Sequence, residues 1–177
     1  NRLWSADVLD GPRASRDLAR ARELRPVVDR AEALIDLHSM TDPCPPLALA
    51  GTRAKGLALA RAVGVPRDIV IDAGHAAGRR VRDYAFFDDP DDPRAALLVE
   101  CGQHWEPSAP AVALEATLRF LAHCGTIDRA DARASRARVA CCWSAVDASC
   151  AKRKPSMQTC RRSRRAGSHR WRSPSIK

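Results

Sequence analysis

Apolar residues along this chain follow two alternating patterns, one with the period of a helix and one made of short uninterrupted runs. The helical spacing covers residues 15–31, 52–63 and 108–125. The short runs cover residues 33–37, 68–71 and 96–100 and predict three buried strands. Because strands alternate with helices, the pattern predicts an α/β fold with a parallel or mixed sheet and flanking helices.

Residues that favour helix ends support these boundaries. Ser15 and Ser108 can each accept a hydrogen bond from a backbone N–H in the first turn of a helix. Gly64 and Gly125 follow the second and third helices, where glycine commonly ends a helix. Pro26 lies inside the first pattern and predicts a kink or a new start. In the third helix we expect a buried stripe of leucines: Leu114, Leu118 and Leu121.

The net charge of +9 is concentrated at one end of the 177 residues. Residues 1–127 hold 16 basic and 18 acidic side chains, whereas residues 128–177 hold 14 basic and 3 acidic ones. The last fifty residues contain no Leu, Phe, Tyr or Glu, and no period in them could bury a face. We therefore predict that residues 128–177 are a basic Arg/Ser/Cys-rich tail, disordered or poorly packed.

Three interpretations of this tail are open. It could bind nucleic acid through its arginines, and it could be a metal module, although it lacks a C-x-x-C pair with matching histidines. The interpretation we favour is translation of a GC-rich gene in a shifted frame after about Ile127, which enriches Arg, Ala, Ser, Cys and Trp. On that interpretation the tail carries little information about function.

Two features predict a soluble, cytoplasmic protein. No apolar run approaches the length needed to span a membrane. The cysteines of residues 1–127 are odd in number and widely spaced, which fits reduced thiols better than a disulfide framework. These cysteines are Cys44, Cys101 and Cys124.

Polar groups follow two of the predicted strands, and they are the candidates for chemistry. "ALIDLHS" ends on Asp36, His38 and Ser39, and "ALLVECGQHW" places Glu100 after four apolar residues. In open α/β sheets, ligands bind beyond the carboxyl ends of the strands. An imidazole is a zinc ligand, a nearby carboxylate often orients such an imidazole, and a second carboxylate can accept a proton from water.

Structural roles are the alternative for each of these residues. A lone histidine at a strand end is more often a hydrogen-bonding group than a metal ligand. His75 and His104 lie near glycine in loops, where surface placement is the default, and "DDPDDP" is most simply a solvated loop. Turn or capping roles are expected for three aspartates: Asp42, Asp72 and Asp83. Glu100 is harder to dismiss, because burying a carboxylate is costly unless it is paired or used.

Four blocks in order resemble the succinylglutamate desuccinylase/aspartoacylase family, which is zinc carboxypeptidase-like. They are "NRLWSADVLDGPR", "ALIDLHSM", "IVIDAGHAAGRRVRDYAFFDDP" and "ALLVECGQHW", and together they cover about residues 1–125. The resemblance implies a zinc carboxypeptidase-like α/β fold and residues 1–127 as a partial zinc-hydrolase catalytic domain. It also implies hydrolysis of an acyl–amino acid amide, or a related amide or ester, with one Zn²⁺ ion.

The resemblance assigns roles to four residues. Asn1 and Arg2 would contact a carboxylate-bearing substrate, and an arginine can grip a carboxylate with two parallel hydrogen bonds. His38 would be a zinc ligand. Glu100 would be the catalytic base that takes a proton from water and passes it to the leaving amine. The implied partner is a small acylated amino acid, with no membrane and no nucleic acid.

The chain also departs from the family pattern. The family's other two protein ligands come from an upstream His-x-x-Glu element, and its small β-rich C-terminal domain would follow near residue 128. Neither is found in the sequence. With His38 alone a site of three protein ligands cannot form, so we expect this chain to be inactive as it stands.

Two alternatives belong to other classes. One is a non-enzymatic nucleic-acid-binding protein that uses residues 128–177, for which salt-dependent binding is the diagnostic property. The other is a hydrolase that uses Cys101 near His104, although no oxyanion element is evident. The plain interpretation of Cys101 is a buried apolar thiol.

Overall fold

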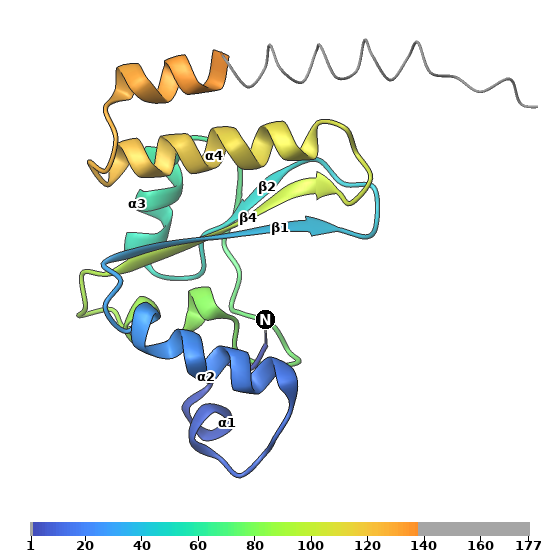
Figure 1. Ribbon diagram of the computed structural model, residues 1–177, viewed down its shortest axis with the longest axis vertical. Helices are drawn as coiled ribbons and strands as arrows, with labels where there is room; N and C mark the ends of the chain where they lie inside the picture. The colour runs from blue at the N-terminus through green and yellow to red at the C-terminus, as the bar shows by residue number, and fades with distance from the viewer. Residues whose placement is uncertain (1, 138–177) are drawn as a thin grey trace, which may run out of the picture. The chain divides into compact units, whose positions relative to one another are not determined.

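A computed structural model describes residues 2–137 of the chain (Figure 1). Two helices open the fold, and strands and helices are interspersed along the rest of the chain. A further helix runs over residues 129–137. The elements are α1 (Ala6–Asp10), α2 (Arg16–Val28), β1 (Ala33–Met40), β2 (Leu47–Leu49), α3 (Ala54–Val63), β3 (Asp68–Val70), η1 (Val81–Asp83), η2 (Ala85–Phe87), β4 (Ala95–Gln103) and α4 (Ala109–His123).

The four strands form one mixed sheet in the order β1-β4-β2-β3. β1 and β4 are parallel, β2 and β3 are parallel, and β2 runs antiparallel to β4. The α/β class, the mixed sheet and the flanking helices predicted from the sequence are therefore confirmed. The two long parallel strands bring their carboxyl ends to the same edge of the sheet.

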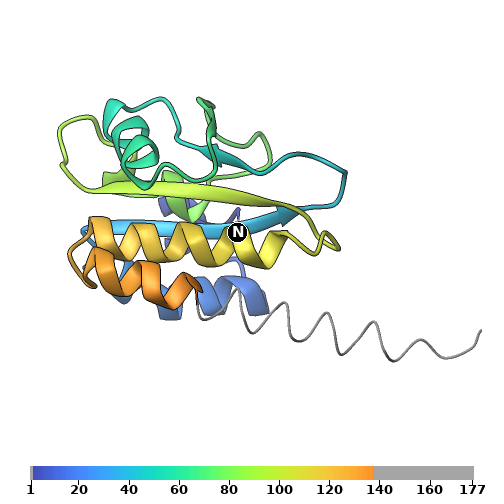
Figure 2. The same ribbon diagram turned by 90° about the horizontal axis from the view of Figure 1, so that it is seen from above.

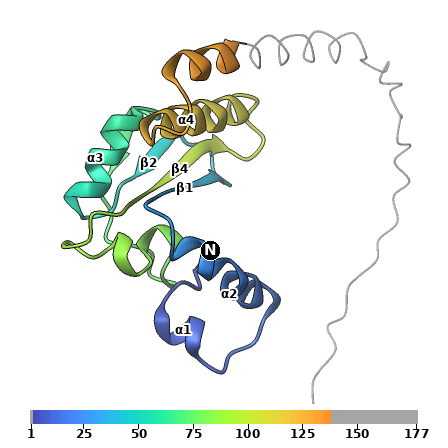
Figure 3. The ribbon, with the colours of Figure 1, turned by 60° about the vertical axis from the view of Figure 1, so that its left-hand side comes forward.

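Each face of the sheet packs against its own set of elements (Figure 3). Leu97, Val99 and Cys101 of β4 face α3 and α4, where they form a core with Leu59 and Phe120. Residues two apart on a strand point to the same face, so Ala96, Leu98 and Glu100 point to the other side. That second face lies toward α2, η1 and η2, and its core includes four large side chains: Trp4, Leu18, Tyr84 and Phe87.

The predicted helix boundaries hold to within a few residues. The Ser15 hydroxyl accepts a hydrogen bond from Leu18 N at 3.1 Å, and Gly64 ends α3 in the left-handed region at φ +65°. Of the two outcomes expected at Pro26, a new helix start is wrong, because α2 continues through Pro26 to Val28. A proline this close to the end of a helix removes one hydrogen bond. Little of the helix follows it, so few other hydrogen bonds are affected.

Three expectations need correction. β1 and β4 extend three residues beyond the predicted ends, and β2 was not predicted at all. The buried residues of α4 are not the leucine stripe but Ala109, Ala116 and Phe120. Small alanines let α4 approach the sheet closely, and the leucines lie beside that contact, partly exposed.

The polar stretch at residues 74–93 is also less exposed than its charges indicate. Tyr84 and Phe87 are buried, and so are Arg80, Arg82 and Asp83. The two short 3₁₀ helices η1 and η2 fold this segment under the second face of the sheet. The part that matches the prediction is residues 88–93, of which Asp89 is exposed.

Residues 128–137 begin the predicted basic tail, and they pack on the domain. Their helix folds back along α4 (Figure 2), Ala132 is buried, and Arg136 pairs with Glu115 at 3.2 Å. The rest of the predicted tail, residues 138–177, lies outside the described residues, so its packing and its reading frame stay predictions. Among the described helices, none is long and apolar enough to cross a membrane.

Candidate active site

His38 and Glu100 are neighbours across the two long parallel strands. In the register of β1 and β4, His38 lies directly opposite Glu100, near the carboxyl ends of both strands. Residues directly opposite each other in a sheet point to the same face, so the imidazole and the carboxylate share one side of it. Placement on opposite faces would have removed the proposed pairing of a metal ligand and a base, and the register excludes it.

Asp36 completes this group from two residues upstream on β1. Its Oδ1 lies 3.0 Å from His38 Nε2, a hydrogen bond that restricts rotation of the imidazole ring. This hydrogen bond raises the pKa of His38 above its ordinary value, and the Glu100 charge acts in the same direction, while burial opposes both. The aspartate thus orients the histidine as the sequence spacing suggested.

Glu100 is partly buried at this edge, without hydrogen bonds that fully offset the loss of water around its carboxylate. Burial raises the pKa of Glu100, the Asp36 charge adds to that effect, and three nearby side chains oppose it: His38, His104 and Arg80. Its Oε2 is buried and has no hydrogen-bond partner among the described residues. A carboxylate held in this way accepts a proton more readily than an exposed one, which suits a general base.

A break in strand register follows directly after this pair. His38 lies opposite Glu100 but Met40 lies opposite Gln103, so β4 contains one extra residue there. Gly102 has φ +113° at this bulge, a backbone conformation that residues other than glycine rarely adopt. Bulges of this kind often lie beside functional sites, where they change the direction of a side chain.

His104 joins the two strand ends across the bulge. Its Nδ1 lies 2.7 Å from Ser39 Oγ and its Nε2 lies 3.3 Å from Thr41 Oγ1. Gln103 Nε2 donates to Thr41 O at 3.0 Å, which adds a further tie between the same segments. The predicted surface placement of His104 is confirmed, and the structure adds a role in holding the ends of β1 and β4 together.

Sequence reasoning missed a buried ion-pair network beneath the site. Arg80 donates to Asp83 and to Asp72, each at 2.6 Å, and Arg82 donates to Asp83 at 2.8 Å and to Ala50 O at 2.9 Å. The expected turn or capping role does not describe the Asp83 side chain, which pairs with Arg80 and Arg82. Asp72 combines the network with a turn contact to Gly74 N at 3.3 Å. The three arginines of "GRRVRD" were the one sequence clue, and a charge run is ordinarily a solvated surface.

Of the two predicted substrate-binding residues, the structure describes only Arg2. Asn1 lies outside the described residues. Arg2 is exposed, and its carbonyl oxygen comes so close to Gly78 that any Cβ at that position would overlap with it. Trp4 N donates to Arg79 O at 3.0 Å. The start of the chain therefore lies beside the segment that continues into Arg80, whose charge acts on Glu100.

The residues at this edge fit only part of a zinc site. His38, oriented by Asp36, fits one ligand, and the unpartnered Glu100 oxygen fits a base. A catalytic zinc site takes three protein ligands and a water. Within residues 2–137, no three His, Cys, Asp or Glu side chains are grouped so as to hold a metal ion.

Cys101 does not belong to the site. It is 3% exposed, lies in the core between β4 and α4, and points away from the face of Glu100. Burial raises its thiol pKa to about 11, so the nucleophilic thiolate is scarce near neutral pH. The plain interpretation of Cys101 as a buried apolar thiol is confirmed.

No family model, curated protein or solved structure matches this chain. The family resemblance drawn from the four sequence blocks therefore stays a prediction.

Proposed function

We propose that this chain is part of a zinc-dependent amidohydrolase of the succinylglutamate desuccinylase/aspartoacylase type, with a zinc carboxypeptidase-like fold. The observation that supports the proposal is the pairing of His38 with Glu100 on adjacent parallel strands, on one face, at the carboxyl edge of the sheet. A histidine ligand and a carboxylate base have to meet in space for this chemistry, and 62 positions separate them in the sequence.

Each residue has a defined part in the proposed reaction. Asp36 fixes the orientation of His38, which serves as one zinc ligand. When bound, zinc would polarise the scissile carbonyl and acidify the attacking water. Glu100 takes the proton of that water and gives it to the leaving amine, a transfer favoured by the raised pKa of its carboxyl group. Asn1 and Arg2 are the proposed contacts for the substrate carboxylate.

The proposed substrate is a small acylated amino acid or a related amide or ester. We expect no turnover from the present chain, because among residues 2–137 His38 is one ligand where a zinc site needs three. The enzyme would be a longer chain in which a His-x-x-Glu element precedes residue 1. The proposal therefore predicts activity only in a protein that joins that element to residues 1–127.

The test is the substitution Glu100→Gln in such a longer chain. Because glutamine keeps the size of the side chain but cannot accept a proton, we expect turnover of N-acyl amino acids to fall by roughly 10²–10⁴-fold. Zinc content, measured by elemental analysis, stays near that of the parent protein, because Glu100 is not a ligand in this scheme.

Glu106→Gln is the matched control. Glu106 is an exposed carboxylate six positions later, outside the proposed site, and its loss leaves turnover unchanged. Full activity in Glu100→Gln rules out the proposed base. Loss of zinc together with activity would instead make Glu100 a ligand, which contradicts the assigned roles.

A further inference from the structure

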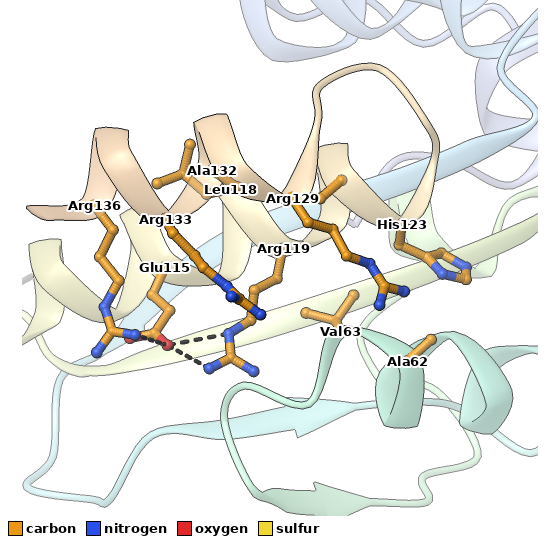
Figure 4. A pocket seen from close by; sticks show the side chains of 11 residues that line it. Ala62, Val63, Glu115, Leu118, Arg119, His123, Arg129, Ala132, Arg133 and Arg136 are labelled. Atoms are coloured by element: carbon orange, nitrogen blue, oxygen red, sulfur yellow. Dashed lines mark hydrogen bonds and ion pairs between the residues drawn. The ribbon is translucent and has the colours of Figure 1, made fainter.

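Arginine side chains converge on a hollow far from the carboxyl edge of the sheet. The hollow has a volume of about 390 Å³ and lies between α3, α4 and the helix over residues 129–137. Figure 4 shows Arg129 and Arg133 extending from that last helix toward Arg119 and the end of α3. Its size is within the range of small-molecule sites, which begins near 300 Å³.

The charges of the residues that line this hollow do not balance one another. Glu115 is the one acid among its lining residues, and it is already shared by Arg119 at 2.7 Å and Arg136 at 3.2 Å. Arg129 and Arg133 have no carboxylate partner among the described residues. With four arginines against one glutamate, the lining has a net charge of +3 even with His123 neutral.

Like charges held together in a concave site favour an anionic occupant. Their mutual repulsion is relieved when an anion enters, and the walls of a hollow focus the field that attracts it. A guanidinium fork matches the geometry of phosphate oxygens and forms two parallel hydrogen bonds to them. Apart from His123, the remaining lining residues are apolar: Ala62, Val63, Leu118, Ala122 and Ala132.

We propose that this hollow, the arginine pocket, binds a small polyphosphate anion through Arg119, Arg129 and Arg133. A compact ligand fits a hollow of this size, whereas a nucleic-acid strand would need a longer basic track. The phosphates could belong to free polyphosphate or to a nucleotide, whose base would contact the apolar wall. The pocket is separate from His38 and Glu100, so the proposal does not depend on the proposed hydrolase. It does require that residues 129–136 are native sequence, which is contrary to the shifted-frame interpretation of the tail.

The test measures binding of inorganic tripolyphosphate to the full chain by calorimetry. Since each arginine provides a charge-assisted hydrogen bond, Arg129→Gln and Arg133→Gln each weaken binding about tenfold or more, and the double variant weakens it further. Both side chains are exposed, so circular dichroism of the variants is expected to match the parent. Added salt weakens binding in the parent, because the interaction is electrostatic.

Arg67→Gln is the matched control, since Arg67 is an exposed arginine that does not line the pocket. The affinity of this variant for tripolyphosphate stays within about twofold of the parent, because the variant removes the same charge at a site away from the pocket. Equal effects of the control and pocket variants overturn the proposal, since binding would then arise from net charge or from residues 138–177.

Further ligands separate the possible sources of the phosphates. Equal affinity for ATP and tripolyphosphate, with none for adenosine, supports recognition of the phosphate chain alone. Tighter binding of ATP supports a nucleotide whose base packs on the apolar wall. Binding only by a single-stranded oligonucleotide, unaffected by the pocket variants, overturns the proposal in favour of a nucleic-acid partner.

Discussion

At the residue scale, the site depends on side chains that the sequence did not single out. Arg82 is 2% exposed, and burial lowers its pKa even though Asp83 lies 2.8 Å away. A buried arginine needs partners that replace its water. Asp83 and Ala50 O are those partners for the two terminal nitrogens of Arg82, while its Nε is buried without a partner among the described residues. The fit is tight, because the guanidinium lies against Gly51, where there is no side chain.

This contact predicts that Gly51→Ala strongly lowers the free energy of unfolding. Gly51 has φ +66°, and a Cβ there would overlap with the guanidinium nitrogens of Arg82. The strain of a left-handed alanine costs about 1–2 kcal/mol, and disturbing a buried ion pair adds roughly 3 kcal/mol or more. We expect urea unfolding to show a loss of about 4 kcal/mol in the free energy of unfolding.

Gly125→Ala separates the two contributions. Gly125 has nearly the same φ of +69°, but nothing lies within 4 Å of the position that an alanine methyl group would take there. This variant therefore loses only the backbone contribution of about 1–2 kcal/mol. Equal losses in the two variants would show that Arg82 does not depend on the space above Gly51.

The main pair of the candidate site could be predicted at this scale, but its surroundings could not. His38 and Glu100 interrupt apolar runs at strand ends, and a local pattern is enough to mark them. The network of Arg80 and Asp83 depends on a loop folding under the sheet, and no local pattern encodes that. The tie between His104 and Ser39 likewise joins residues 65 positions apart.

At the element scale, the sequence predicted the long elements and the short strand β3, and it missed β2 and α1. α2, α3 and α4 have enough residues for a helical period to be visible, and residues that favour helix ends mark their boundaries. Apolar runs marked β1 and β4, but did not predict their last three residues. β2 has three residues between Pro46 and Gly51, and α1 has five, so neither shows a full period. β2 exists because β4 offers it backbone hydrogen bonds, which is a tertiary cause.

Helix caps give a paired prediction, because two serines occupy the same position in two helices. Ser15 Oγ accepts a hydrogen bond from Leu18 N, whereas Ser108 makes no capping bond with its side chain. Ser15→Ala therefore loses about 1 kcal/mol in the free energy of unfolding, and Ser108→Ala loses a few tenths at most. Thermal and urea unfolding of the two variants, compared with the parent, measure the difference. Similar losses would mean that α2 does not use its cap.

At the scale of the whole described molecule, Tyr84 connects segments that are distant in the sequence. Its hydroxyl donates to Asp29 Oδ1 at 2.8 Å and accepts from Arg25 Nε at 3.0 Å, which links the junction of η1 and η2 to the end of α2. Its ring packs against Trp4 from the start of the chain, at 5.3 Å between centroids. Tyr84 thus connects the segments that cover the second face of the sheet: the start of the chain, the end of α2 and the 3₁₀ helices.

Tyr84 therefore predicts how the stability of this layer depends on pH. Burial raises the pKa of Tyr84 above its ordinary value of 10.0, with a further increase from Asp29 and an opposing effect from Arg25. Below pH 10 both the folded and the unfolded state keep the phenol proton, so the contribution is fully present. Above pH 10 the unfolded state loses its proton first, so the free energy of unfolding decreases until the pH passes the folded pKa.

The measurement is direct, because the chain contains a single tyrosine. Ultraviolet absorbance of the tyrosinate, followed from neutral to alkaline pH, gives a midpoint above 10 in the folded protein and about 10 in urea. In Tyr84→Phe the absorbance change disappears, and the alkaline loss of stability becomes shallower because that proton no longer differs between states. Identical midpoints with and without urea would show that the phenol is solvated and that the link between η2 and α2 is not formed.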